Sequence, residues 1–154
     1  MRKILLLLSF AISSIALSNS SDPRRQNLNE EDSLLYNRLD SICYYIDSLQ
    51  IEHREYVLAQ SLWETGWYRC DNCAWSRGNN LFGFKGKSGY IVYDSWVESV
   101  VAYDKWQEKR LSAYRETHSE VDYLKFLLWA KYATSDTYTS HVKYMYNWLM
   151  KNYF

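Results

Sequence analysis

Apolar residues recur at helical spacing along most of the chain. The first such run consists of five residues that are separated by four, three, four and three positions: Leu35, Leu39, Ile42, Ile46 and Leu49. This spacing is that of one face of an α-helix. Asn29 and the three acids at 30–32 predict the start of this helix, because acids are favoured at its positive end.

Further helices are predicted downstream. One runs from about Glu52 to Trp63 and is stopped by Gly66, since glycine adopts the left-handed cap conformation at little cost. Ser95 and Glu98 form a capping box that predicts another helix start, and Ser119 with Asp122 indicates the next. A final helix carries four residues at helical spacing: Tyr138, Val142, Met145 and Leu149.

Residues 66–93 show a different pattern. Glycines at 78, 83, 86 and 89 alternate with short polar runs, which is typical of turns. The β-prone run GYIVY at 89–93 favours a small hairpin or an irregular lobe. The pattern therefore predicts an α+β domain that is mostly helical, with one small β-hairpin lobe.

The N-terminal segment has the layout of a secretory signal peptide over residues 1–18: basic residues, an apolar run, then small residues. The alternative, a membrane anchor, requires roughly 20 apolar residues, and serines interrupt this run. We expect export to the periplasm or the medium, with no stable membrane insertion after cleavage. Residues 19–28 are expected to form a flexible lead, and residues 29–154 a single domain that is monomeric.

Charge and composition narrow the class of partner. The chain has 18 basic and 18 acidic residues, so loss of Arg2 and Lys3 leaves 16 against 18, a net charge near −2. This balance gives no attraction to nucleic acid. The 15 Tyr and 7 Trp are flat side chains with apolar faces and polar tips, which suit sugar binding as well as ordinary cores.

The three cysteines do not indicate a cofactor. Cys70 and Cys73 form a Cys-x-x-Cys without the βαβ pattern of redox proteins, and four zinc ligands are not gathered in the sequence. We expect a local disulfide or two loop thiols, no metal and no cofactor. Cys43 is compatible with a buried thiol or with a bridge to the loop.

One acid stands out in the stretch SLWETGWYRC. Glu64 lies in the last turn of its helix, where the helix dipole disfavours a negative charge, and Trp63 and Trp67 flank it. Both effects raise a carboxyl pKa, as a general acid at neutral pH requires. A surface glutamate is the alternative interpretation.

Four segments favour the general acid over the surface glutamate. They follow one another along the chain in this order: LAQSLWETGWYRC, NNLFGFKG, YDSWVESVVAYDKWQ and YATSDTY. Together they resemble the glucosaminidase domain of glycoside hydrolase family 73, a family of peptidoglycan hydrolases. The resemblance implies a lysozyme-like fold and an exported enzyme that cleaves β-1,4 bonds after N-acetylglucosamine in peptidoglycan or a related glycan.

The resemblance also implies a site. Glu64 matches the catalytic acid and Tyr132 the active-site tyrosine, while Asn80 and Phe82 match the cleft floor. Further candidates for sugar binding are Trp67 in the irregular region, Tyr138 at the end of the last motif, and Asp94 after the lobe.

The chain departs from the family at the second carboxylate. Family members often carry a glutamate in the lobe, but GFKGKSGYIVY contains no acid, and Asp94 is the nearest. We therefore expect the substrate's own acetamido group to assist. The alternatives are a muramidase or lytic transglycosylase, a glycoprotein endoglycosidase, and a non-catalytic glycan-binding protein.

Overall fold

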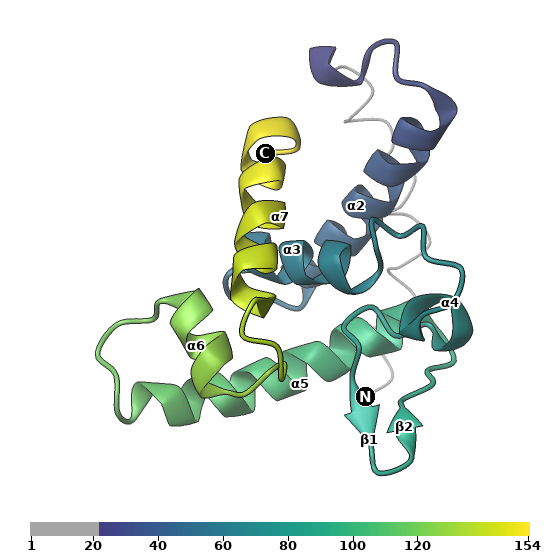
Figure 1. Cartoon of the computed structure of the whole chain (residues 1–154). Helices are drawn as coiled ribbons and strands as arrows, with labels where there is room; N and C mark the ends of the chain where they lie inside the picture. The colour runs from purple at the N-terminus through teal and green to yellow at the C-terminus, as the bar shows by residue number, and fades with distance from the viewer. Residues whose placement is uncertain (1–21) are drawn as a thin grey trace. The chain divides into compact units, whose positions relative to one another are not determined.

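The computed structural model describes residues 22–154 (Figure 1). The segment 1–18, expected to be a signal peptide, lies outside the described residues. The chain divides into two compact units between Ser41 and Ile42. Within residues 22–154, no helix combines the length and the apolar character needed to cross a membrane.

The first unit contains a short turn and the start of a long helix. The 3-10 helix η1 (Pro23–Arg25) lies in the part of the expected flexible lead that the structure describes. The guanidinium of Arg25 forms a bidentate ion pair with Asp40. This segment therefore contains defined local structure.

Helix α2 (Glu30–Ser48) begins where the sequence predicts. The Oδ1 atom of Asn29 accepts a hydrogen bond of 2.8 Å from the Asp32 amide, so Asn29 supplies the N-terminal cap. Leu39 and Ile46 of the predicted apolar face are fully buried.

The second unit is mostly helical, as the sequence predicts. Its helices, in chain order, are α3 (Arg54–Glu64), α4 (Ala74–Gly78), α5 (Trp96–Arg115), α6 (Tyr123–Trp129) and α7 (Tyr138–Asn152). The antiparallel strands β1 (Lys85–Gly86) and β2 (Gly89–Tyr90) form the predicted hairpin. Helix α4 was not predicted, because its five residues show no periodicity.

The helix starts follow local capping chemistry. The Ser95 hydroxyl accepts from the Glu98 amide, as in the expected capping box, but the Glu98 carboxylate accepts from the amide of Asp94. Helix α6 is capped by Asp122 and not by Ser119, since the Asp122 carboxylate accepts from the amides of Leu124 and Lys125.

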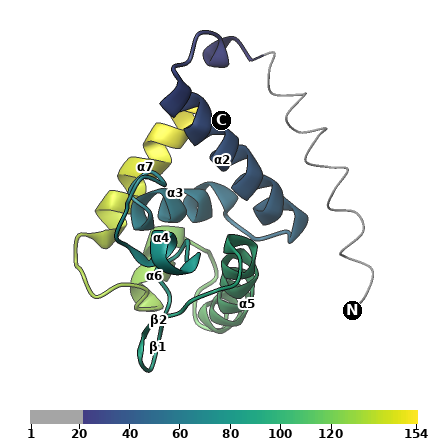
Figure 2. The same cartoon turned by 90° about the vertical axis from the view of Figure 1, so that its right-hand side faces the viewer.

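The core of the second unit lies where its helices meet. Helix α3 packs along α7, and α6 contacts both α5 and α7 (Figure 2). The side chains with no more than 1% of their surface exposed include Leu58, Leu62, Leu81, Phe126, Val142 and Leu149. All four predicted apolar positions of α7 are buried.

Asn80 holds the hairpin lobe together. Its side chain is 1% exposed. The Nδ2 atom donates to the carbonyls of Phe84 (2.8 Å) and Ile91 (2.9 Å), and Oδ1 accepts from the Phe84 amide (3.0 Å). One amide side chain thus ties both ends of the hairpin to the loop before it.

The cysteines follow the first of the expected arrangements. Cys70 and Cys73 form a disulfide within the loop before α4. Cys43 is buried, and its Sγ atom lies 3.8 Å from a carboxylate oxygen of Asp47.

We expect Asn80→Ala to lower the free energy of unfolding by about 2–3 kcal/mol, because it leaves a buried amide and two carbonyls without their partner. Urea unfolding measures this. The exposed Asn72 is the matched control, and its replacement by Ala is expected to change stability by less than about 0.5 kcal/mol. Equal effects of the two substitutions would contradict the structural role of Asn80.

Candidate active site

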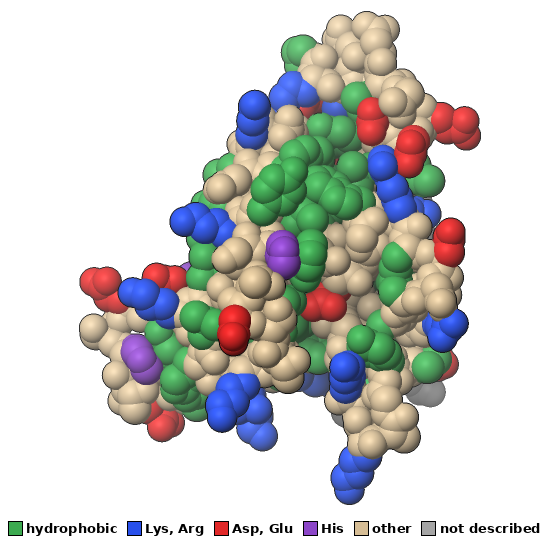
Figure 3. Space-filling view, viewed as in Figure 1, with side chains coloured by type: hydrophobic (Ala, Val, Ile, Leu, Met, Phe, Trp, Pro, Cys, Tyr) green, Lys and Arg blue, Asp and Glu red, His purple; other side chains and the backbone are tan. Residues whose placement is uncertain are grey.

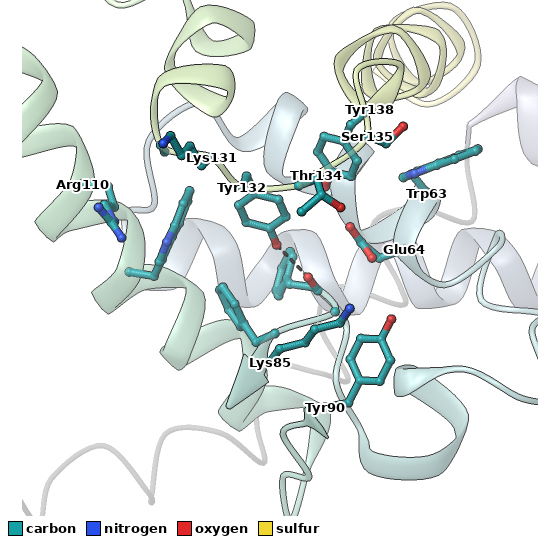
Figure 4. Close-up of a pocket in the computed structure, with 16 residues that line it drawn as sticks. Trp63, Glu64, Lys85, Tyr90, Arg110, Lys131, Tyr132, Thr134, Ser135 and Tyr138 are labelled. Carbon is teal, nitrogen blue, oxygen red and sulfur yellow. Dashed lines mark hydrogen bonds between the residues drawn. The ribbon is translucent and has the colours of Figure 1, made fainter. Parts of the chain in front are cut away.

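A cavity of about 510 Å³ opens between the end of α3, the hairpin lobe, α5 and the segment that joins α6 to α7 (Figure 4). It belongs entirely to the second unit. Its lining residues are Trp63, Glu64, Phe82, Gly83, Phe84, Lys85, Tyr90, Trp106, Arg110, Ala130, Lys131, Tyr132, Ala133, Thr134, Ser135 and Tyr138.

Glu64 is the one acid among these lining residues. It is the last residue of α3, and the helix ends there because the chain turns at Gly66, whose φ is +53°. Burial raises the pKa of Glu64 from 4.5 to about 7, while a hydrogen bond from Tyr138 and the charge of Lys85 act in the opposite direction. At neutral pH the carboxyl is therefore divided between its acid and its ionised form, so it can both give and take a proton.

Gly83 leaves room for this carboxyl. A Cβ atom built on Gly83 would lie 2.5 Å from Oε2 of Glu64, closer than two such atoms can approach. The residue also has a φ of +65°, which favours glycine. The loop can pass beside the acid only because position 83 has no side chain.

Buried polar groups orient the carboxyl from the other side. The Tyr138 hydroxyl accepts a hydrogen bond of 3.1 Å from Nε2 of Gln60, which leaves its own proton to donate to Glu64. Gln60 is fully buried and lies one helical turn before Glu64 on α3. Gln60 therefore fixes the direction in which Tyr138 donates.

The same hydrogen bonds continue into the core. Tyr103 donates to Oε1 of Gln60, and its oxygen lies 2.6 Å from that of Tyr123. Since each phenol has one proton, Tyr123 donates to Tyr103. Gln107 in turn donates to Tyr123 (2.8 Å). Every donor in the series points toward Glu64.

Tyr132 faces the cavity from the segment after α6. Its hydroxyl donates to the Phe82 carbonyl (2.7 Å), so its oxygen keeps lone pairs that can accept from a ligand. Burial, followed by the nearby Tyr138 hydroxyl and Glu64, raises the pKa of Tyr132 well above its ordinary value. The phenol therefore stays neutral.

Trp63 provides an aromatic wall. It is 36% exposed, and its ring stacks on His141 with centroids 4.0 Å apart and planes inclined by 10°. Trp67, by contrast, does not line the cavity. It packs edge-on against Trp148 at 4.7 Å, because the left-handed conformation at 67 turns the chain back toward α7. Trp67 is therefore not among the lining residues, and sugar binding by it stays a prediction.

A family model described as mannosyl-glycoprotein endo-β-N-acetylglucosaminidase matches residues 45–151, which is more than half of the chain. The chain belongs to this glucosaminidase family. No curated protein gives a significant match. Membership implies a glycoside hydrolase that acts on a glycan, the chemistry for which a buried carboxylic acid is suited.

The structure places four predicted residues of this glucosaminidase at the cavity: Glu64, Phe82, Tyr132 and Tyr138. Asn80 does not line it, because its amide is used by the backbone of the lobe. Asp94 is exposed at the start of α5, also outside the cavity. Sugar binding by Asn80 and Asp94 is thus not supported. The catalytic roles of Glu64 and Tyr132, and sugar binding by Phe82 and Tyr138, stay predictions.

Sequence reasoning missed several lining residues of the glucosaminidase. Trp63 was expected only to raise the pKa of the neighbouring acid, and Trp106 was not among the expected site residues. Lys85 belongs to the segment NNLFGFKG but was given no role, and Arg110 and Lys131 lie in none of the four segments. The position of Trp63 next to the acid in the sequence was the one available signal.

We expect Tyr138→Phe to move the basic limb of the pH profile of kcat/KM to higher pH. The lost hydrogen bond favours the carboxylate, so its removal raises the pKa of Glu64 further. We also expect kcat/KM at neutral pH to fall about tenfold. The exposed Tyr144 on α7 provides the control, and Tyr144→Phe is expected to leave the profile unchanged. A limb that stays in place or moves to lower pH in Tyr138→Phe would contradict the assignment.

Proposed function

We propose that the protein is an exported N-acetylglucosaminidase that cleaves the β-1,4 bonds of peptidoglycan after N-acetylglucosamine, with Glu64 as the general acid. The observation that carries this proposal is a single carboxyl with a pKa near 7 inside a cavity lined by aromatic rings. At neutral pH such a group retains a proton for the leaving oxygen of a glycosidic bond.

The lining residues support a mechanism in which the substrate itself supplies the nucleophile. Two-carboxylate glycosidases place the second acid about 5–10 Å from the first. Among residues 22–154, Glu64 is the only Asp or Glu that lines the cavity. The carbonyl oxygen of the substrate's 2-acetamido group therefore takes the place of the nucleophile and attacks the anomeric carbon while Glu64 protonates the departing oxygen.

Tyr132 is suited to support this attack. As the acetamido oxygen bonds to carbon, its nitrogen becomes positive, and an acceptor for the N–H group stabilises that charge. The Tyr132 oxygen has free lone pairs because its proton is held by the Phe82 carbonyl. In the second step the Glu64 carboxylate removes a proton from water. The water oxygen bonds to the anomeric carbon as the bond between that carbon and the acetamido oxygen breaks, which restores the acetamido group and the Glu64 acid.

Two further parts of the proposal concern the fold and the location of the protein. The helical unit with a small antiparallel hairpin beside the cavity is consistent with a lysozyme-like fold. Export is supported by the layout of residues 1–18 alone.

A lytic transglycosylase is the second candidate. The same single acid favours it, since that reaction needs no second carboxylate and ends in an anhydro sugar in place of a free reducing end. Mass spectrometry of the fragments distinguishes the two. N-acetylglucosamine at the reducing end supports the proposal, and anhydro products would overturn it in favour of the transglycosylase.

We expect Glu64→Gln to lower kcat on purified cell walls about a thousandfold, because the amide has no proton of suitable acidity to give. Asp94→Asn is the matched control and is expected to retain wild-type activity within about twofold. Assays of released reducing ends measure both. A loss for Asp94→Asn as large as that for Glu64→Gln would show that a second carboxylate takes part.

A further inference from the structure

Three basic residues border the proposed active-site cavity, and each comes from a different element. Lys85 lies on β1, Arg110 near the end of α5, and Lys131 just after α6. None of the three forms an ion pair with any residue of 22–154. Two arginines elsewhere in this part of the chain do form such pairs, Arg115 with Glu52 and Arg25 with Asp40.

The positive charge of the cavity is a local property. The chain as a whole has equal numbers of basic and acidic residues, and both kinds are scattered over the face shown in Figure 3. The cavity lining, however, contains three cations and the single acid Glu64. Cations held in a concave site strengthen one another's field, so the cavity attracts anions although the protein does not.

The charges are also distributed unevenly along the cavity. In Figure 4, Arg110 and Lys131 lie together at one end, whereas Trp63 lies at the other end and Glu64 lies close to it. The third cation, Lys85, lies between the two ends, with its ammonium 4.9 Å from the centre of the Tyr90 ring. Two of the three cations therefore lie at the end of the cavity away from Trp63 and Glu64.

We propose that the end formed by Arg110 and Lys131 is a binding site for a carboxylate carried by the glycan. This inference rests on the proposed function and narrows its substrate to acidic, N-acetylated polymers. A neutral glycan gives two unpaired cations no partner, whereas a carboxylate accepts hydrogen bonds from both a guanidinium fork and an ammonium.

Two parts of peptidoglycan carry this chemistry. One is a carboxylate attached to the sugar itself through a lactyl ether, and the other is a carboxylate of the attached peptide. In both cases the carboxylate belongs to a unit other than the N-acetylglucosamine whose glycosidic bond is cut. This agrees with the separation of the cationic end from Glu64 in Figure 4.

The test measures affinity in the Glu64→Gln background, so that it does not depend on turnover. Tryptophan fluorescence reports the Kd for three ligands of equal length: a neutral N-acetylglucosamine oligomer, a peptide-free strand with lactyl carboxylates, and the same strand with its peptides. The variants are Arg110→Gln, Lys131→Gln and the pair together. Lys109→Gln is the matched control, because it removes one positive charge from the same helix outside the cavity.

Each single substitution is expected to weaken binding of the carboxylated strands by about threefold to tenfold more than binding of the neutral oligomer, and the pair by more than either. Lys109→Gln is expected to leave the ratio of the two Kd values unchanged. The preference for carboxylated strands is also expected to fall as salt rises. A change already present with the peptide-free strand assigns the lactyl group, and a change seen only with peptides assigns the peptide carboxylate.

The inference is overturned if the Arg110 and Lys131 variants weaken all three ligands equally, or if they behave like Lys109→Gln. Failure of the proposed function has a different signature, because wild-type protein would then release no reducing ends from any of the three glycans. A protein that binds carboxylated strands selectively without cutting them would keep the inference and reject the function.

Discussion

The site depends on keeping one carboxyl group away from water at the end of a helix. Glu64 is the last residue of α3, and burial there raises its pKa to about 7. Three residues set the surroundings of this carboxyl. Gly66 ends the helix after Glu64, and Gly83 lets the next loop pass within contact distance of the acid. Tyr138 donates a hydrogen bond that limits the rise of the Glu64 pKa. An exposed glutamate would be ionised at neutral pH and would have no proton to give.

The hydrogen bonds behind Glu64 connect this chemistry to the stability of the core. Gln60 and Tyr103 have no exposed surface, and each is a polar group whose burial is tolerated because its partners are in place. A buried network that is fully satisfied holds its members in one arrangement. The donor that reaches Glu64 is thus fixed by the packing of α3, α5, α6 and α7, and it does not have to be ordered when substrate binds.

Local sequence signals predicted the parts of the fold that local chemistry determines. Caps such as Asn29 and Ser95 marked the helix starts, and the spacing that includes Tyr138 marked the buried face of α7. Glu64 could be predicted as the acid because its signals, the flanking tryptophans and its position at the end of a helix, are also local in the sequence. The direction in which a loop side chain points is set by distant contacts, and there the sequence misled: Trp67 packs on Trp148, and Asn80 is held by Ile91. Arg110 and Lys131 were not found for the same reason, since only the packed fold brings them to one cavity.

The most direct test of the account is the ionisation of Glu64 in the folded protein. Titration of side-chain carboxyl carbons by NMR, with Glu64→Gln used to assign the resonance, measures this pKa without any substrate. The account predicts a value of about 7. A value near the 4.5 of an ordinary glutamate would mean that the carboxyl is ionised throughout the neutral range, and Glu64 would then not be a general acid.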